Sequence, residues 1–126
     1  MKAGFAEIVI TPPDGEYYLA AYGDPKATGV HDDVYASAVY LEDDHTTAIL
    51  ISLDLIGMWR RLVLQLKEAV QQVVDIDDDH IFFTCTHTHK GPDVLGRMTD
   101  RKARGVVPPG YMAEYPGFLA AQVEIV

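Results

Sequence analysis

The sequence predicts an α/β fold in which helices pack on a mixed β-sheet, and three observations carry that prediction. First, two β-rich segments, 34–41 and 46–53, flank a polar turn, which is typical of an antiparallel hairpin. Second, residues 58–74 repeat apolar side chains at three- and four-residue spacing, which predicts an amphipathic helix. Third, a short apolar run at 81–86 follows that helix. A strand–helix–strand connection places its two strands parallel in one sheet, so the sheet is expected to be mixed.

The elements before the helix follow from turn residues and side-chain pattern. Residues 5–10 form a β-rich run that ends at Pro12, which has no N–H to donate to a neighbouring strand. A long loop continues to about residue 33, and loops of this length are usually functional. The segment 46–53 is almost continuously apolar, which predicts a central strand covered on both faces.

The helix and the segments after it complete the predicted order. We expect the apolar stripe of the helix to pack in the core; it consists of Trp59, Leu62, Val63, Leu66, Ala69, Val70 and Val73. The acidic stretch 75–79 is predicted to be a loop, as is the basic segment 90–110. A last helix is expected to begin near Pro116 and to run to the C-terminus, since proline is favoured in a first helical turn.

Composition restricts the class of protein. The chain has 126 residues, which predicts a single domain over 1–126, and its 48% hydrophobic and 23% charged content is typical of a globular protein. Its formal net charge of -9 disfavours binding to a nucleic-acid backbone. No apolar run approaches the roughly 20 residues of a membrane span. The single cysteine, Cys85, excludes an internal disulfide and suits a reducing compartment, so we expect a cytoplasmic protein.

The strongest chemical motif is a pair of histidines directly after the last predicted strand. In an extended backbone His87 and His89 point to the same side, so their two imidazoles can converge. Neutral imidazole is a preferred ligand of Zn²⁺, and ligands gather at the carboxyl ends of strands in open α/β sheets. The alternative is that one histidine faces the core and the other faces solvent.

Two histidines do not complete a catalytic zinc site, because catalytic zinc usually has three protein ligands and a water. The further candidates are His31, at the end of the first loop, and Asp54, at the end of a central strand. For Asp54 the alternative is a helix N-cap or turn role. For His31 the alternative is a polar turn before a strand.

Three ordered motifs resemble the N-terminal part of the neutral/alkaline (non-lysosomal) ceramidases. They are Gly29-Val30-His31-Asp32, Ser52-Leu53-Asp54-Leu55-Ile56-Gly57 and Thr86-His87-Thr88-His89-Lys90-Gly91-Pro92-Asp93. The opening residues, 3–13, fit the same pattern, so the resemblance extends over nearly the whole chain.

The resemblance implies a zinc-dependent amidase that hydrolyses the N-acyl bond of ceramide. It implies that His87 is a zinc ligand and that His89 is a neighbouring catalytic histidine. A zinc-activated water would attack the amide carbonyl while the metal polarises it. The remaining zinc ligands of the family, a histidine, a glutamate and a tyrosine, lie further downstream. The resemblance therefore implies that this chain is an N-terminal piece of a larger catalytic domain.

Basic residues concentrate beside the histidines. Five of the ten lysines and arginines fall in the segment 90–110: Lys90, Arg97, Arg101, Lys102 and Arg104. As a hypothesis, this segment is a lid that attracts an anionic group of the substrate, with Lys90 and Arg97 as substrate-binding residues. The alternative is a solvated loop with no ligand.

Three functional hypotheses follow. The first is a zinc-dependent hydrolase of ceramidase type that acts on a small-molecule or lipid amide. The second is a non-catalytic, truncated α/β module that forms a homo-oligomer. In the third, another chain supplies the missing zinc ligands.

Overall fold

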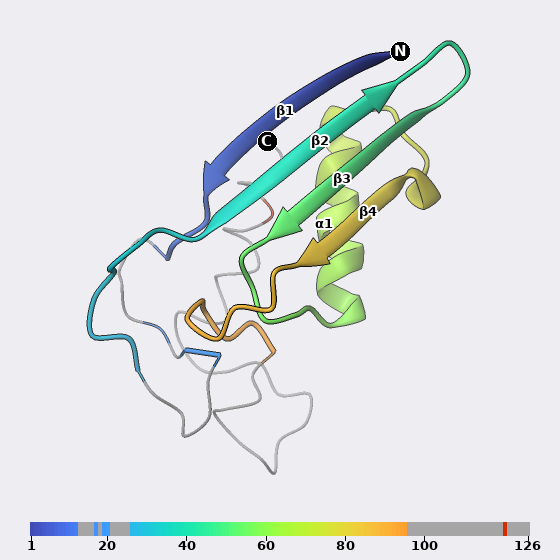
Figure 1. The fold of residues 1–126 in the computed structure, drawn as a ribbon. Helices are drawn as coiled ribbons and strands as arrows, with labels where there is room; N and C mark the ends of the chain where they lie inside the picture. Colours follow the sequence, from blue (N-terminus) through green and yellow to red (C-terminus); the bar gives the residue numbers. More distant parts are fainter. Residues whose placement is uncertain (13–16, 18, 21–25, 96–119, 121–126) are drawn as a thin grey trace.

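The computed structural model describes residues 1–12, 17, 19–20, 26–95 and 120. Over these residues the structure contains a four-stranded sheet with one α-helix against it (Figure 1). The elements in chain order are β1 (Lys2–Val9), β2 (Tyr35–Glu42), β3 (Thr47–Leu53), α1 (Arg60–Val73), the 3₁₀ turn η1 (Asp78–His80) and β4 (Ile81–Cys85). The predicted α/β class is confirmed.

The strands lie in the sheet in the order in which they occur in the chain. β1 pairs antiparallel with β2, and β2 pairs antiparallel with β3, as the hairpin prediction required. β3 and β4 are parallel, with Leu53 opposite Cys85, because α1 carries the chain back between them. The sheet is therefore mixed, and β1 and β4 are its outer strands in the described part of the chain (Figure 1).

One face of the sheet packs against α1 and forms the core. Ile49, Ile51 and Leu53 point to this face from β3, and α1 contributes Leu62, Leu66, Ala69 and Val70 as its buried residues. Alternate strand residues point to the opposite face, since side chains along a strand alternate. On that face Leu50 is 45% exposed. The prediction that this strand is covered on both faces is therefore wrong for the residues that the structure describes.

The helix also differs from its prediction at both ends. It begins at Arg60 rather than at residue 58, and Trp59 is the residue before it, with an extended backbone. The indole of Trp59 is 58% exposed and its N–H donates to the carbonyl of Leu95 at 2.8 Å. Val73 is also exposed, so the two ends of the predicted apolar stripe lie outside the core. A three-to-four spacing fixes a helical face, but it does not show how far along the helix the core extends.

Smaller differences concern the segments around the sheet. The first strand begins at Lys2 instead of residue 5, and the acidic loop contains the turn η1. The predicted helix at 116–126 lies outside the described residues except for Ala120, which is helical and packs against the core. Among the described residues, no helix is long and apolar enough to cross a membrane.

Candidate functional site

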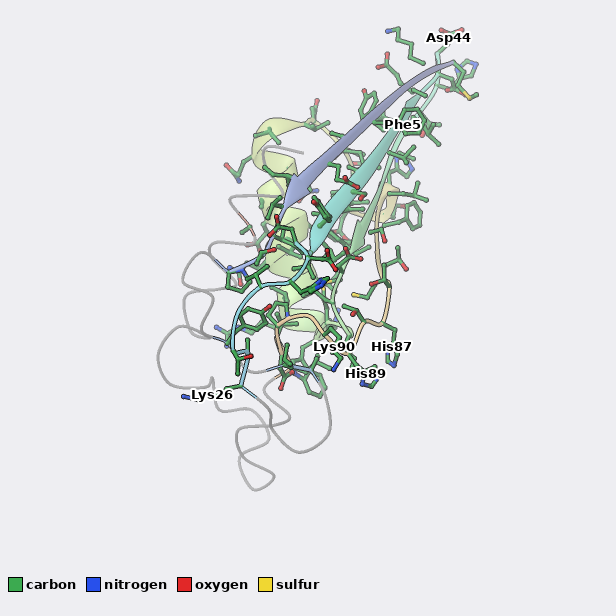
Figure 2. All side chains as sticks on the ribbon, turned by 60° about the vertical axis from the view of Figure 1, so that its left-hand side comes forward. Phe5, Lys26, Asp44, His87, His89 and Lys90 are labelled. Atoms are coloured by element: carbon green, nitrogen blue, oxygen red, sulfur yellow. The ribbon has the colours of Figure 1, made fainter. Side chains whose placement is uncertain are left out.

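The candidate site lies where the parallel strands β3 and β4 both end. The chain leaves β3 through residues 54–57 and leaves β4 through residues 86–89, and the two segments run together. The amide of Thr86 donates to the carbonyl of Leu53 at 3.0 Å, and the amide of His87 donates to the carbonyl of Leu55 at 3.0 Å. Figure 2 shows His87, His89 and Lys90 together at this end of the sheet, far from Asp44 in the hairpin turn.

The ring of His87 is held by the backbone of the neighbouring segment. Its Nδ1 lies 2.7 Å from the carbonyl oxygen of Ile56. A carbonyl can only accept a hydrogen bond, so Nδ1 carries the proton and donates it, which leaves the lone pair on Nε2. Zinc-ligating histidines usually donate their other ring N–H to a carbonyl or carboxylate in this way. The His87 imidazole is therefore compatible with a metal at Nε2.

His89 lies beside His87. The two ring centroids are 5.3 Å apart and the rings are nearly perpendicular, at 80°. Both residues are exposed. The rings come together by a route that the sequence analysis did not predict, because His87 has a φ of 63°. This left-handed conformation, which non-glycine residues seldom adopt, turns the chain immediately after β4 instead of extending the strand.

Gly91 lets the histidine segment approach the end of β3 closely. A Cβ atom at this position would lie 2.7 Å from the carbonyl oxygen of Asp54 and 3.1 Å from Cγ2 of Thr88. The first contact is with backbone, which cannot move aside as a side chain can. Next to Gly91, Pro92 and Asp93 are buried, and Asp93 accepts a hydrogen bond from the amide of Leu95 at 3.0 Å.

Described residues of the first loop lie against the same segment and border an open cavity. The amide of Ala20 donates to the carbonyl of Gly91 at 3.0 Å, and Leu19 pairs with Pro92. The cavity has a volume of about 540 Å³. Its polar and charged lining includes Tyr17, Lys26, Thr28, His31, Asp32, Asp33, Asp54, Thr88 and Lys90.

Of the five predicted site residues that the structure describes, the cavity brings together three and leaves out two. His31, Asp54 and Lys90 line it, whereas His87 and His89 are not part of its wall. The same segment contributes Thr88 and Lys90 to the cavity wall and carries the histidine pair outside it. The candidate site therefore has two neighbouring parts, a histidine pair and a charged cavity.

The second-rank candidates have visible structural contacts. The side chain of Asp54 accepts a hydrogen bond from the amide of Tyr35 at 3.0 Å, which links the ends of β3 and β2. The Nδ1 of His31 lies 2.7 Å from the carboxylate of Asp32, and both side chains are almost fully exposed. The Asp54 contact is with the start of β2 and not with a helix N-terminus or the turn at 55–58, whereas the His31 contact is local to the polar segment before β2. Arg97, predicted to bind substrate, lies outside the described residues.

Burial affects two titratable groups near the site. Tyr17 is buried in the cavity wall, and desolvation together with the carboxylate of Asp33 raises the pKa of its phenol above 10.0. Desolvation also raises the pKa of the Cys85 thiol above 9.0, so this thiol stays protonated at neutral pH.

A second group of possible metal ligands lies near η1. The side-chain ligand atoms of Asp77, Asp79 and His80 all lie within 4.8 Å of one another. Both aspartates are exposed, and the group precedes β4, at the opposite end of that strand from His87. Exposed acidic groups of this kind are common on protein surfaces, so we assign no site to it.

No family model matches the chain, and no curated protein matches it. The chain is similar to the crystal structure of neutral ceramidase from Pseudomonas aeruginosa, with a TM-score of 0.65 and 21% identity over 74% of this chain. It is also similar to a structure described as ceramidase complexed with C2, with a TM-score of 0.62 and 19% identity over 74% of this chain.

These similarities establish a ceramidase-like fold for the described strands and helix. The chain spans 16% and 15% of the two matched ceramidase chains, so it corresponds to a part of that fold. At this level of identity the likeness concerns the fold alone.

Several features of the site had no signal in the sequence. The carbonyl of Ile56 is a backbone group, and its role depends on how two loops pair in space. The left-handed backbone of His87 was equally hidden, since histidine gives no sign of it. Gly91 did carry a signal, because a glycine beside a proline marks a turn, but the close approach to Asp54 could not be read from it.

Proposed function

We propose that this protein is a zinc-dependent hydrolase of ceramidase type that cleaves an N-acyl amide bond. One observation carries the proposal more than any other: the Nδ1 of His87 donates to the carbonyl of Ile56 and leaves Nε2 for a metal. The ceramidase-like fold and the motifs at 86–93 support the same proposal.

In this proposal His87 is a zinc ligand through Nε2. Bound zinc would lower the pKa of a water to about 7 and polarise the amide carbonyl. We propose that His89, whose ring lies 5.3 Å from that of His87, moves a proton to or from the reacting groups. Its exposure keeps its ring accessible to a substrate.

The zinc ligands other than His87 are not fixed by the described residues. His31 and Asp54 are the candidates among the described residues; each has a local partner, and both line the cavity, whose wall does not include His87 or His89. Membership of the ceramidase family would place further ligands outside this chain, in a longer polypeptide or in another subunit. We therefore propose that the 126-residue chain provides part of the catalytic site.

For the substrate, we propose a small-molecule or lipid amide. Lys90 lines the cavity beside the histidines, and we propose that its ammonium group pairs with an anionic group of the substrate. Arg97 is proposed to act with it. A cytoplasmic location remains our proposal, based on the single cysteine and the composition.

The first test is metal analysis of untagged protein after dialysis against zinc. We expect the wild-type chain to bind zinc, with at least a tenfold loss of affinity in His87→Ala and a much smaller change in His89→Ala, because only His87 is proposed to be a ligand. The matched controls are His45→Ala, at the far end of the sheet, and His80→Ala, in the group near η1. Zinc that persists in His87→Ala, or that is lost only in His80→Ala, would refute the proposed site.

A second measurement separates the functional alternatives. Zinc-loaded protein is incubated with short- and long-chain N-acyl amides, and release of the free amine is followed. Hydrolysis that disappears in His89→Ala supports the enzyme. Binding of zinc without hydrolysis of any amide favours a non-catalytic module, and gel filtration then shows whether zinc binding depends on an oligomer.

A further inference from the structure

The face of the sheet opposite α1 carries a row of apolar side chains that runs across all four strands. The registers place Phe5 opposite Val39, Val39 opposite Leu50, and Leu50 opposite Phe82. All four alternate with residues that pack under α1, so they lie on the other face. Phe5, labelled in Figure 2, is 79% exposed and Phe82 is 53% exposed. We call these four residues the cross-sheet row.

A row of this kind is an unusual feature of a free surface. Scattered exposed apolar residues are normal, but contiguous ones usually mark an interaction site. Cross-strand neighbours on one face lie about 5 Å apart, so the four side chains form one continuous patch. From these observations we infer that the cross-sheet row is the centre of an interface with a second copy of this chain, in which two sheets pack face to face.

The charge distribution favours a second copy over a partner chosen by charge. The chain has a net charge of -9, so most surfaces of two copies repel each other. Among the described strand residues on this face, Glu7 is the one charged side chain, and its carboxylate accepts a hydrogen bond from Ser37 at 2.8 Å. A nearly neutral face on an acidic protein gives a basic partner nothing to recognise, while two copies can meet there with little local repulsion.

The area of the face also fits a dimer of modest strength. Four strands spaced about 4.8 Å apart make the face roughly 20 Å wide. A seven-residue strand such as β3, which rises about 3.3 Å per residue, makes it roughly 23 Å long. Two such faces bury on the order of 1,000 Å² in total, which is the lower limit for a specific interface. Sheets that pack face to face lie about 10 Å apart, with their strands rotated by about 30°. A two-fold axis near Leu50 would bring the cross-sheet row of one copy against the same row of the other copy.

The structure offers a matched pair of variants for the test. Leu50 and Leu64 are both leucines with nearly equal exposure, 45% and 43%, but Leu50 lies in the cross-sheet row and Leu64 lies on α1. Replacing either by lysine adds the same charge. Sedimentation equilibrium of the full chain from about 5 to 500 μM should show a monomer–dimer equilibrium. We expect Leu50→Lys to weaken it at least tenfold and Leu64→Lys to leave it unchanged.

Two further measurements keep the inference testable if a variant is poorly folded. Raising the salt concentration from 50 to 500 mM should strengthen the wild-type dimer, because screening reduces the repulsion between two acidic chains. Phe82→Ser, at an outer strand, should weaken the dimer as Leu50→Lys does. A monomer at every concentration and salt, or a dimer that both leucine variants weaken equally, would overturn the inference. The outcome is independent of zinc binding, so it does not depend on the proposed function.

Discussion

At the scale of single residues, the site depends on two backbone features around His87. The carbonyl of Ile56 accepts a hydrogen bond from Nδ1 and so selects the tautomer of the His87 ring, and the left-handed φ of 63° at His87 turns the chain toward His89. Unfavourable backbone conformations persist only where surrounding contacts hold them. Here those contacts include the hydrogen bond from the His87 amide to Leu55 and the close approach of Gly91 to Asp54.

Gly91→Ala tests that close approach. The new Cβ would meet the carbonyl oxygen of Asp54 at 2.7 Å, so the two segments must separate. We expect a loss of about 1–3 kcal/mol in the free energy of unfolding, measured by urea denaturation. The control is Gly57→Ala in the neighbouring loop, where the nearest atom would be 3.9 Å away. Equal free energies of unfolding for the two variants would show that Gly91 does not lie as close to the carbonyl oxygen of Asp54 as the structure indicates.

Tyr17 predicts a pH dependence of stability. Its pKa in the folded protein is raised above 10.0, mainly by burial. A phenol whose folded pKa is raised contributes stability that is present below the unfolded pKa and is lost as pH rises through the folded pKa. We therefore expect the urea midpoint of wild type to fall above about pH 10 more steeply than that of Tyr17→Phe. Parallel curves for the two proteins would contradict the assignment.

At the scale of elements, α1 holds the core through one face only. Leu66 is fully buried, whereas Leu64, two residues earlier, is 43% exposed. Leu66→Ala should therefore cost about 2–5 kcal/mol of stability, while Leu64→Ala should change it by about 0.5 kcal/mol or less. Thermal or urea unfolding of both variants measures the difference. Similar losses for both would mean that the helix packs differently from the structure.

The strands and their pairing could be predicted from the sequence because the residue patterns that specify them are local. Two β-rich runs on either side of a polar turn predicted β2, β3 and their antiparallel pairing, and the strand–helix–strand step predicted the parallel pairing of β4. The prediction from sequence failed where burial depends on what else is present. The apolar run of β3 was read as a strand covered on both faces, but Leu50 remains half exposed because no described element covers that side.

The candidate site was predictable only in part, and for a similar reason. The two histidines and Asp54 could be placed at strand ends, since parallel neighbours end at the same edge of a sheet. Which groups they contact depends on the path of three loops. Those paths put Asp54 against Tyr35 and place the cavity beside the histidine pair instead of around it.

At the scale of the whole molecule, the two ends of the sheet have different characters. The hairpin end carries exposed polar side chains, including Asp44 in Figure 2, and the opposite end gathers both histidines, the cavity and the first loop. The chain corresponds to about a sixth of the ceramidases that it resembles in fold. The face of the sheet opposite α1 is apolar and is covered by none of the described elements, which is where we infer that a second copy packs.

The most direct test of the proposed zinc site is the tautomer of His87, observed by ¹⁵N–¹H correlation NMR on the histidine rings of the full chain. Before zinc is added, the ring should carry its proton on Nδ1, as the hydrogen bond to Ile56 requires. Addition of zinc should shift the Nε2 resonance of His87 while the ring of His45 stays unchanged. A proton found on Nε2, or a His87 signal that does not respond to zinc, would contradict the account.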